Sequence, residues 1–517
     1  MSTDSAPGLN LARYFLFDRL DEGLGEKTAI LFGSQQHSYA DVANRVCALG
    51  AYLMSTGHRP EERVLIALQD SPAFAWSFFA ALRIGGVVAM GNPGAPPKDL
   101  EYLVRYTRAT VVITHASVAL SIASTLNKHD CTVVLVRAVS TGDDILAPID
   151  APKEVPNAVT LPEAMGQGRA GIDAGEPWKR QTQQDDPAVW LFTSGSTGKS
   201  KAAIHSHRDF VFNTERYALG TVHYESDDIT VSVPRLYFGY ATGTNLMFPF
   251  RVGATTGLFS ERPTPKTLGE AIDEYRPTII TNVPTMMGKL LDDDDARQTR
   301  GETRLDMKQV RFHLSAGEAL PPSLLTRFVD RFGGEVYDGI GSAEMFHIYC
   351  SNRPNDVRPG SLGRVVEGYE IKLLPVDAIG PGADEVPVGE TGVMWVRGDS
   401  VAHGYFQDRE KSWTTFHGHW CRTGDLFRRD ADNYFWFEGR ADDLLKVGGV
   451  WVAPIEVEDC MLTHDAVSAV AVIGALRDGL VKPKAFVVLR EDARLALGDA
   501  TAEAQLAAKL KKHVQAK

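Results

Sequence analysis

The sequence has few cysteines, lacks a long apolar run and shows no leader-like pattern in its first residues. Its five cysteines are scattered, with no CxxC pair and no metal-ligand spacing: Cys47, Cys131, Cys350, Cys421 and Cys460. This excludes a disulfide framework and a zinc site, and predicts reduced thiols in a cytoplasmic protein. No run of about 18 apolar residues occurs, which excludes a membrane-spanning helix. The N-terminus has no basic segment before an apolar one, so we expect no signal peptide.

Basic residues are outnumbered by acidic ones. The chain has 66 Asp and Glu against 54 Lys and Arg, a formal net charge of −12. A surface of this sign repels phosphates, which argues against a general nucleic-acid or membrane-surface binder, so any nucleotide must be held locally. The chain has 517 residues, 44% of them hydrophobic, and is therefore globular and too long for one core. We expect two or more domains.

Helical and strand patterns alternate in the first part of the chain. Ser38 is a candidate N-cap for a helix whose apolar positions, among them Val42 and Val46, recur at helical spacing. The elements expected next are a strand at 64–68, a helix at 74–84, a strand at 87–90, a helix at 97–105 and a strand at 111–114. This alternation predicts a parallel, helix-covered sheet. Residues 150–186 are richer in Pro, Gly and charge, and are expected to form a surface excursion.

The pattern resumes later in the chain. Buried strands are expected at 278–283 and 309–314, each followed by polar or small residues. Ligand groups of open α/β sheets usually lie at such positions. The acidic run at 292–295 is expected to be a solvated loop rather than a metal site, because four consecutive aspartates cannot all point one way.

The domain organisation follows from where this pattern changes. From residue 388 the strands shorten and turns multiply, which predicts a smaller β-rich subdomain. The polar segment 439–443 follows a strand-like segment and is the preferred domain boundary. The predicted fold is α/β, with a large N-terminal domain of parallel, helix-covered sheets plus the β-rich subdomain at 1–438. A hinge at 439–442 and a small, mobile α+β domain at 443–517 complete it.

One stretch, residues 193–201, has the sequence Thr-Ser-Gly-Ser-Thr-Gly-Lys-Ser-Lys and follows an apolar run. Glycines let backbone N–H groups approach an anion, hydroxyls add donors and lysines supply charge, so the stretch is typical of a phosphate site. It is not a Walker A loop, because Thr193 stands where that motif needs glycine. A return strand is expected at 202–204, with a helix starting only near His207. The alternative is a flexible Ser/Gly hairpin without a ligand.

Five motifs occur in a fixed order along the chain. They are residues 193–201, Ser-Ala-Gly-Glu at 315–318, Asp-Gly-Ile-Gly-Ser-Ala-Glu at 338–344, Arg-Thr-Gly-Asp at 422–425 and Gly-Arg-Ala-Asp-Asp-Leu-Leu-Lys at 439–446. Together they resemble the adenylate-forming superfamily of acyl-CoA synthetases, peptide-synthetase adenylation domains and luciferases, over nearly the whole chain. The segments Glu-Met-Phe-His-Ile at 344–348 and Ser-Asn-Arg-Pro at 351–354 are similar to those of benzoate-CoA ligases.

The resemblance implies a reaction in two halves. A carboxylate first attacks the α-phosphate of ATP, which expels pyrophosphate and leaves an acyl-adenylate; the thiol of coenzyme A then displaces AMP. The catalytic residues that it implies are Thr193, Lys199, Glu344 and Lys446, with Glu344 also holding Mg²⁺. The implied phosphate-binding residues are Ser194, Gly195, Ser196, Thr197 and Gly198.

The resemblance also implies where the nucleotide binds. Asp425 matches the ribose-binding aspartate and Arg440 its usual partner, although a surface turn is the plain alternative for Asp425. The residues that match the adenine pocket are Gly317, Glu318, Asp338, Gly339 and Ile340. Ile340 stands where most of the superfamily has tyrosine.

The implied substrate pocket is aromatic. Its residues are Phe238, Gly239, Tyr240, Ala316, Gly341 and His347, with Phe238 as the gate and Tyr240 in the wall. Gly239 leaves about a methyl group more space than alanine, which favours a substituted ring such as 2-aminobenzoate. An aromatic stripe and a lone histidine such as His347 are also typical of ordinary core.

The last set of implied residues concerns the small domain. Asp442 matches the hinge about which that domain turns between the two half-reactions. Gly448 and Gly449 match the loop that approaches the CoA thiol, where glycine permits close contact. Lys446 precedes them and has a solvated surface lysine as its alternative interpretation.

Two features depart from the superfamily pattern. Ala343 replaces a threonine whose hydroxyl contacts the α-phosphate, and losing such a donor costs on the order of 3 kcal/mol in transition-state stabilisation. The chain ends at Lys517, before the expected Pro-Lys-Thr-x-x-Gly-Lys segment, so we expect either a truncated product or an impaired first half-reaction.

The leading hypothesis is therefore an ATP-dependent aryl-CoA ligase for benzoate or a small substituted benzoate, with 2-aminobenzoate favoured. Its expected partners are a small aromatic carboxylic acid, ATP and coenzyme A, with no nucleic acid or membrane; a homodimer is left open. Two alternatives remain. One is a stand-alone adenylating enzyme that loads a carrier protein, and the other is a non-catalytic homologue that binds an adenylate.

Overall fold

The computed structural model describes residues 8–155, 157–194, 199–447, 450–477, 480–495 and 500–515. The chain divides into two compact units. The first unit comprises Met1–Glu370 and Arg397–Cys421, and the second comprises Ile371–Val396 and Arg422–Lys517. The proposed hinge at 439–442 belongs to the second unit, and its role stays a prediction.

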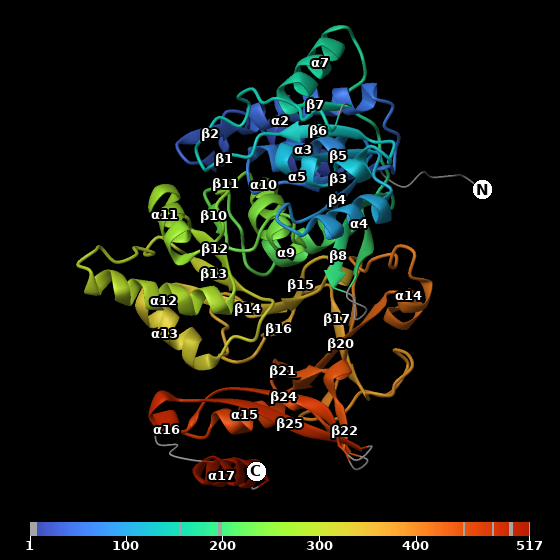
Figure 1. Ribbon diagram of the computed structural model, residues 1–517. Coiled ribbons are helices and arrows are strands. Elements are labelled where there is room, and N and C mark those ends of the chain that lie inside the picture. Colours follow the sequence, from blue (N-terminus) through green and yellow to red (C-terminus); the bar gives the residue numbers. More distant parts are fainter. Residues whose placement is uncertain are drawn as a thin grey trace. The chain divides into compact units, whose positions relative to one another are not determined.

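A seven-stranded sheet forms one part of the first unit, in the order β7-β6-β5-β3-β4-β8-β9. Its strands are β3 (Arg63–Ala67), β4 (Val87–Met90), β5 (Val111–His115), β6 (Thr132–Val136), β7 (Ala158–Thr160), β8 (Pro187–Ser194) and β9 (Ser200–Ser206). Neighbouring strands pair in parallel except β8 and β9, which form an antiparallel hairpin. Its helices are α2 (Tyr39–Ser55), α3 (Pro72–Arg83), α4 (Pro97–Thr107), α5 (Ala116–Ser121), α6 (Ala123–Leu126) and α7 (Leu161–Asp173). The expected parallel sheet with helical connections is confirmed (Figure 1).

A nine-stranded sheet forms the other part of this unit, in the order β16-β15-β14-β13-β12-β10-β11-β1-β2. Its strands are β1 (Thr28–Phe32), β2 (Gln35–Ser38), β10 (Ile229–Ser232), β11 (Thr255–Leu258), β12 (Ile279–Asn282), β13 (Phe312–Ser315), β14 (Glu335–Gly341), β15 (Ile348–Ser351) and β16 (Arg364–Val365). The six central strands are parallel, and β2, β15 and β16 join antiparallel.

Helices and short helical turns connect this second sheet. They are η1 (Arg13–Phe17), α1 (Asp18–Asp21), α8 (His207–Asn213), η2 (Thr214–Leu219), α9 (Gly239–Thr242), η3 (Gly243–Met247), α10 (Phe248–Val252), α11 (Pro265–Tyr275), α12 (Pro284–Thr299), α13 (Pro322–Phe332), η4 (Ala343–Met345) and α14 (Arg409–Thr415). Helices α11, α12 and α13 lie together beside the sheet (Figure 1), where Met287, Leu290 and Phe328 are buried against Ile280. Their apolar faces bury one side of the sheet and leave its carboxyl edge for polar residues.

Helix α2 begins where the sequence predicts it. Ser38 is the N-cap and forms a capping box with Asp41, since each side chain bonds the backbone N–H of the other. Val42, Val46, Leu49 and Leu53 are all buried. A cap of this kind contributes about 1 kcal/mol, and the apolar stripe fixes which face packs inward.

The structure corrects the expectation for residues 150–186. This segment contributes the edge strand β7 and the helix α7, which packs on α2. Thr160 and Glu163 form a capping box at the start of α7. The pattern was obscured by Gly166, Gly168 and Gly171, which lower helix propensity; of the three, Gly168 is the one at which α7 lies against α2.

The acidic run at 292–295 is also not a loop. It lies within α12, and Asp294 is fully buried, accepting bonds from Arg331 at 2.7 Å, Arg304 at 3.2 Å and the Leu305 N–H at 3.0 Å. The sequence prediction failed because a buried carboxylate is satisfied here by two arginines distant in sequence.

The second unit combines a sheet with a small α+β arrangement. Strand β18 (Thr391–Arg397) pairs β17 (Glu370–Leu374) and β20 (Trp420–Arg429), and β20 pairs β21 (Phe435–Arg440). The other elements of the second unit are η5 (Ala441–Asp443), β22 (Leu445–Val447), β23 (Val450–Val452), α15 (Pro454–Leu462), β24 (Val467–Arg477), β25 (Leu480–Leu489), α16 (Glu491–Leu495) and α17 (Ala500–Gln515). Met461, Val467 and Leu510 form a core between α15, β24 and α17. Strand β19 (Phe416–His417) belongs to the first unit, where it pairs with the first residues of β20.

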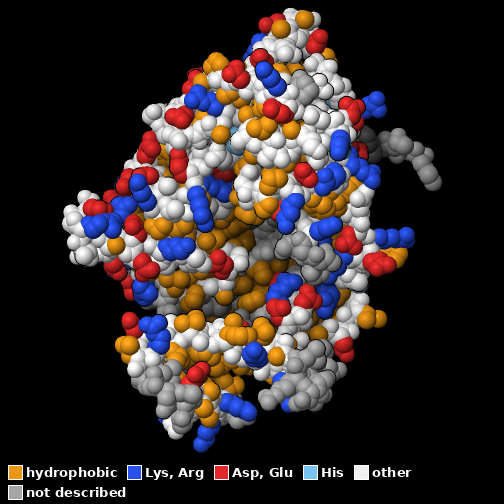
Figure 2. Space-filling view, viewed as in Figure 1, with side chains coloured by type: hydrophobic (Ala, Val, Ile, Leu, Met, Phe, Trp, Pro, Cys, Tyr) orange, Lys and Arg blue, Asp and Glu red, His pale blue; other side chains and the backbone are white. Residues whose placement is uncertain are grey.

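The structure also locates the charged side chains and the cysteines. On the face shown in Figure 2, Lys and Arg side chains are interspersed with Asp and Glu. None of the five cysteines forms a disulfide. Within the described part of the chain, no helix has the length and hydropathy needed to cross a membrane.

The contact between α7 and α2 gives a stability prediction. A Cβ at Gly168 would lie 1.9 Å from the Ala48 carbonyl oxygen, so Gly168→Ala must push α7 away from α2. Overpacking of this kind costs about 1–3 kcal/mol. We expect a lower melting temperature for Gly168→Ala. The matched control is Gly166→Ala in the same helix, where a Cβ would meet nothing within 4 Å; it should raise stability by roughly 0.5–1 kcal/mol. Equal effects of the two substitutions would contradict the packing.

Candidate active site

The β8–β9 hairpin carries the predicted phosphate-binding stretch. Thr193 pairs with Lys201 and Ser194 with Ser200, and α8 begins only after β9. A strand therefore follows the stretch, as expected, and the Walker A alternative is excluded. Thr193 is half-buried and Lys199 is exposed. Gly195, Ser196, Thr197 and Gly198 lie outside the described residues, and the phosphate role of the stretch stays a prediction.

Glu344 lies beside this hairpin. Its Oε1 accepts a 2.6 Å hydrogen bond from the Tyr405 hydroxyl, and Tyr405 forms a β-bridge with Ala203 of β9. The Lys201 ammonium lies 3.9 Å from the centroid of the Tyr405 ring. Burial, and then the Glu344 charge, raise the pKa of Tyr405 far above its usual value, so this phenol remains a donor. Tyr405 thus joins the carboxylate and one lysine of the hairpin, a link that no motif indicated.

The backbone around Glu344 is also fixed. The Glu344 carbonyl accepts from the Ala402 N–H at 2.8 Å, and the Met345 carbonyl accepts from the Ser400 hydroxyl at 2.9 Å. Phe346 follows with φ of +69°, a left-handed conformation that is unfavourable for a residue with a side chain. These bonds hold a tight turn that presents Glu344.

Polar side chains end three adjacent parallel strands. Asn282 of β12 pairs with Ser315 of β13, and Ser315 pairs with Asp338 of β14, so the three lie in a row. Asp338 is buried and its Oδ1 has no hydrogen-bond partner among the described residues. Burial raises the pKa of Asp338 to about 7, although the Ser315 hydroxyl and the Gly339 N–H lower it. The motifs included Asp338 and Ser315, whereas Asn282 was expected only as part of the strand at 278–283.

Other residues of the predicted pockets cap a helix or allow close backbone approach. Glu318 accepts from the Thr285 N–H at 2.9 Å and the Thr285 hydroxyl at 2.6 Å, at the start of α12. Gly317 has φ of +87°, which suits glycine. A Cβ at Gly339 would lie 2.8 Å from the Cys350 oxygen, and one at Gly341 would lie 2.5 Å from the His347 oxygen. The last two glycines therefore allow β15 to approach.

Asp70 holds the start of the predicted substrate segment, at Arg235 and Leu236. Asp70, at the end of β3, accepts from the Leu236 N–H at 3.0 Å and lies 3.5 Å from the Arg235 guanidinium. Burial raises the pKa of Asp70 to about 6, with Arg235 opposing that shift. Phe238 is 54% exposed, which is compatible with a gate. Sequence reasoning missed Asp70, because its partner lies about 165 residues away.

His347 and Tyr240 meet in the structure. The His347 Nε2–H donates to the Tyr240 carbonyl at 3.0 Å, and the imidazole packs among Tyr217, Tyr240 and Phe248. Its Nδ1 has no hydrogen-bond partner among the described residues. Burial lowers the pKa of His347 to about 4, so the ring is neutral at pH 7 and Nδ1 carries a lone pair. Ala316, the other small residue of the predicted pocket, is buried.

In the second unit, Asp425 and Arg440 form the predicted pair. They face each other across β20 and β21, with Arg440 Nη1 2.5 Å from Asp425 Oδ1. Asp425 is therefore in a strand and not in a surface turn. Arg440 also lies 3.7 Å from Asp442. The Lys446 side chain, Gly448 and Gly449 lie outside the described residues.

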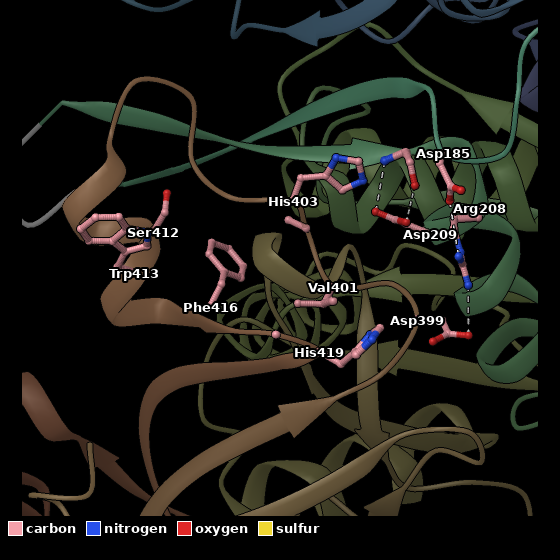
Figure 3. A pocket seen from close by; sticks show the side chains of 13 residues that line it. Asp185, Arg208, Asp209, Asp399, Val401, His403, Ser412, Trp413, Phe416 and His419 are labelled. Atoms are coloured by element: carbon pink, nitrogen blue, oxygen red, sulfur yellow. Dashed lines mark hydrogen bonds and ion pairs between the residues drawn. The ribbon is translucent and has the colours of Figure 1, made fainter. Parts of the chain in front are cut away.

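A cavity of about 470 Å³ opens on the first unit, behind α8. Figure 3 shows Arg208 between the carboxylates of Asp185 and Asp399, at 3.4 and 3.3 Å. Trp413 and Phe416 contribute an aromatic wall, and Asp209 and Ala402 line the cavity as well. No motif predicted this cavity.

The two helix-covered sheets, with polar side chains in register on adjacent parallel strands, are typical of α/β enzymes that bind nucleotides. The chain belongs to the family of AMP-binding enzymes, which matches residues 17–406. The predicted superfamily is confirmed.

Among individual proteins, the chain is similar to several aryl-CoA ligases. The chain is similar to the benzoate–CoA ligase of Thauera aromatica, with 36% identity over 90% of this chain and 84% of that protein. The crystal structure of the anthranilate CoA ligase AuaEII in complex with anthranoyl-AMP matches with a TM-score of 0.81 and 30% identity, over 100% of this chain and 92% of that one. A benzoate CoA ligase from Burkholderia xenovorans LB400 matches with a TM-score of 0.79 and 33% identity, over 98% and 93% of the two chains.

The buried neutral His347 gives a pH prediction. Between pH 6.5 and pH 4 the unfolded chain binds a proton at His347, whereas the folded chain does not. Acidification over this range therefore lowers the free energy of unfolding. From pH 7 to pH 5 this amounts to about 2 kcal/mol. Urea denaturation of the wild type and of His347→Gln should therefore give a stability difference that shrinks as pH falls. A difference that stays constant over this range would contradict the assignment.

Proposed function

We propose that this chain is an ATP-dependent aryl-CoA ligase that acts on benzoate or a small substituted benzoate, with 2-aminobenzoate favoured. The aryl carboxylate attacks the α-phosphorus of ATP, so that pyrophosphate leaves and an aroyl-adenylate forms. The CoA thiol then attacks the aroyl carbonyl, losing its proton, and AMP leaves. The observation that carries the proposal is the short turn at 343–347. Its Glu344 is connected to the β8–β9 hairpin through Tyr405, and its His347 is hydrogen-bonded to the Tyr240 carbonyl in the predicted substrate segment.

The carboxyl edge of the nine-stranded sheet fits an adenine base. The unpartnered Asp338 Oδ1 is a buried acceptor, and an exocyclic amino group would supply the donor that it lacks. Asp338, Gly339 and Ile340 form one wall of this proposed pocket, with Gly317 and Glu318 on the neighbouring loop. Asp425 and Arg440 remain the proposed ribose-binding residues, and Asp442, Lys446, Gly448 and Gly449 keep their proposed roles in the second half-reaction.

A magnesium ion fits the site only together with phosphates. Among the described residues no group of three or more His, Cys, Asp and Glu side chains is placed to hold a metal. Glu344 offers a single carboxylate, and Mg²⁺ is usually held by one or two carboxylates plus substrate phosphates and water. When bound, the ion would neutralise charge on the phosphates. Glu344 would hold it, with Thr193, Lys199 and the rest of the hairpin donating to the β and γ phosphates.

Ala343 lacks the hydroxyl that the superfamily's threonine donates to the α-phosphate, so another group must supply that hydrogen bond. The neighbouring Ser342 hydroxyl is buried and has no hydrogen-bond partner among the described residues. It is the nearest hydroxyl in sequence to the α-phosphate position that the resemblance implies. We therefore propose that Ser342 compensates for the lost threonine hydroxyl.

The proposed substrate pocket places a neutral imidazole beside aromatic rings. The His347 Nδ1 lone pair accepts a donor on the ring, such as an amino group, while Phe238 and Tyr240 border the aryl ring. At Gly239 an added methyl would lie 3.3 Å from both δ carbons of Leu191 and 3.6 Å from the Phe346 oxygen. Gly239 thus keeps space at a tightly packed wall.

The test is thioester formation with ATP, CoA and a panel of benzoates, comparing the wild type with Gly239→Ala. We expect aroyl-CoA from benzoate and 2-aminobenzoate, and none from fatty acids. Because one methyl group in a pocket changes selectivity by roughly 10-fold or more, Gly239→Ala should lower kcat/KM for 2-aminobenzoate about tenfold relative to benzoate.

Three outcomes would count against the proposal. Fatty-acyl thioesters would overturn the aryl substrate class, and equal losses for both acids in Gly239→Ala would overturn the role of Gly239. Adenylate formation without transfer to CoA would favour loading of a carrier protein. Benzoate serves as the internal control for the folding of the variant.

A further inference from the structure

His205 lies in β9 and is fully buried, with both ring nitrogens hydrogen-bonded. Nε2 lies 2.7 Å from the Ala343 carbonyl oxygen, and Nδ1 lies 2.8 Å from Asp209 Oδ2. The Ala343 carbonyl oxygen can only accept, so Nε2–H donates to it, while Nδ1 faces the Asp209 carboxylate. His205 therefore forms a buried, hydrogen-bonded link between α8 and the turn that bears Glu344.

Asp209 is itself held in one orientation. Its Oδ2 accepts from the Ser206 N–H at 3.1 Å, and its Oδ1 accepts from the Ser206 hydroxyl at 2.6 Å. These bonds form the capping box of α8 and leave the Asp209 side chain 3% exposed. Asp209 also lines the cavity of Figure 3, together with Ala402, whose N–H bonds the Glu344 carbonyl.

The His205 bond completes a series along the backbone. The carbonyls of Ala343, Glu344 and Met345 accept from His205, from the Ala402 N–H and from the Ser400 hydroxyl respectively. Ala343 has only a methyl group as side chain, so its position depends on its backbone contacts. Of the three donors, His205 is the one whose own orientation is fixed by a carboxylate.

We infer that His205 and Asp209 form a positioning pair that orients the 343–345 turn, and through it the Glu344 carboxylate, for metal-nucleotide binding in the adenylation half-reaction. A buried polar pair of this kind contributes little to stability compared with apolar residues of the same volume. Its directional bonds do fix one geometry of the turn. The link to the adenylation half-reaction rests on the proposed function. The orientation of the 343–345 turn by His205 and Asp209 does not depend on it.

The experiment compares wild type, His205→Leu, Asp209→Ala and Asp209→Asn. The matched control is His58→Leu, which removes another buried histidine whose Nδ1 lies 3.0 Å from the Thr110 hydroxyl. The first readout is the Mg²⁺ concentration for half-maximal aryl-acid-dependent ATP–pyrophosphate exchange. The second is hydrogen–deuterium exchange of the peptide that contains residues 343–347.

We expect His205→Leu and Asp209→Ala to need about tenfold more Mg²⁺, the usual effect of removing a partner behind a metal ligand. The KM for the aryl acid should stay unchanged, and the 343–347 peptide should exchange faster. Asp209→Asn should fall between wild type and Asp209→Ala, because an amide NH₂ placed at Oδ2 can bond Nδ1 but loses the hydrogen bond from the Ser206 N–H. His58→Leu should lower the melting temperature without either effect.

The inference is overturned if the 343–347 peptide of His205→Leu and Asp209→Ala exchanges as in His58→Leu. It is equally overturned if their Mg²⁺ requirement matches that of the control. Absence of pyrophosphate exchange in the wild type would instead refute the proposed function, and peptide exchange would still decide the positioning role. If His205→Leu does not fold, Asp209→Ala carries the same comparison.

Discussion

Three consecutive backbone carbonyls, those of Ala343, Glu344 and Met345, accept hydrogen bonds from two separate segments of the first unit, strand β9 and residues 400–402. Backbone bonds of this kind fix a turn more firmly than its own sequence can, since Phe346 next to it has an unfavourable positive φ. The strain is tolerated because the surroundings over-determine it. Glu344 thereby lies against Tyr405 and the β8–β9 hairpin, and the other groups of the site are arranged around this turn.

The same part of the molecule keeps buried polar atoms without partners. Asp338 Oδ1, the Ser342 hydroxyl and His347 Nδ1 are all buried, and none has a hydrogen-bond partner among the described residues. Each such group costs stability in the absence of a ligand. Their concentration at the carboxyl edge of one sheet, beside a carboxylate, is what a site for a polar nucleotide and an aromatic acid requires.

The sequence predicted what depends on local pattern. The Ser38 cap, the parallel strands and the hairpin at 193–201 follow from short-range propensity, and the motif order led to Glu344, Asp338 and the Asp425–Arg440 pair. It failed at 292–295, because the arginines that satisfy Asp294 come from elsewhere in the chain. Helix α7 was missed because its glycines lower helix propensity, although one of them, Gly168, serves the contact with α2. His205, Asp70 and Tyr405 were missed because their partners are brought together only by the fold.

The most direct test of the account is aryl-acid-dependent ATP–pyrophosphate exchange by the wild type and by Glu344→Gln, measured at saturating Mg²⁺. This substitution keeps a hydrogen-bond acceptor for Tyr405 but removes the charge. The account predicts exchange in the wild type, a loss of about 100-fold or more in Glu344→Gln, and unchanged thioester formation when the aroyl-adenylate is supplied. Exchange at the wild-type rate in Glu344→Gln would contradict it.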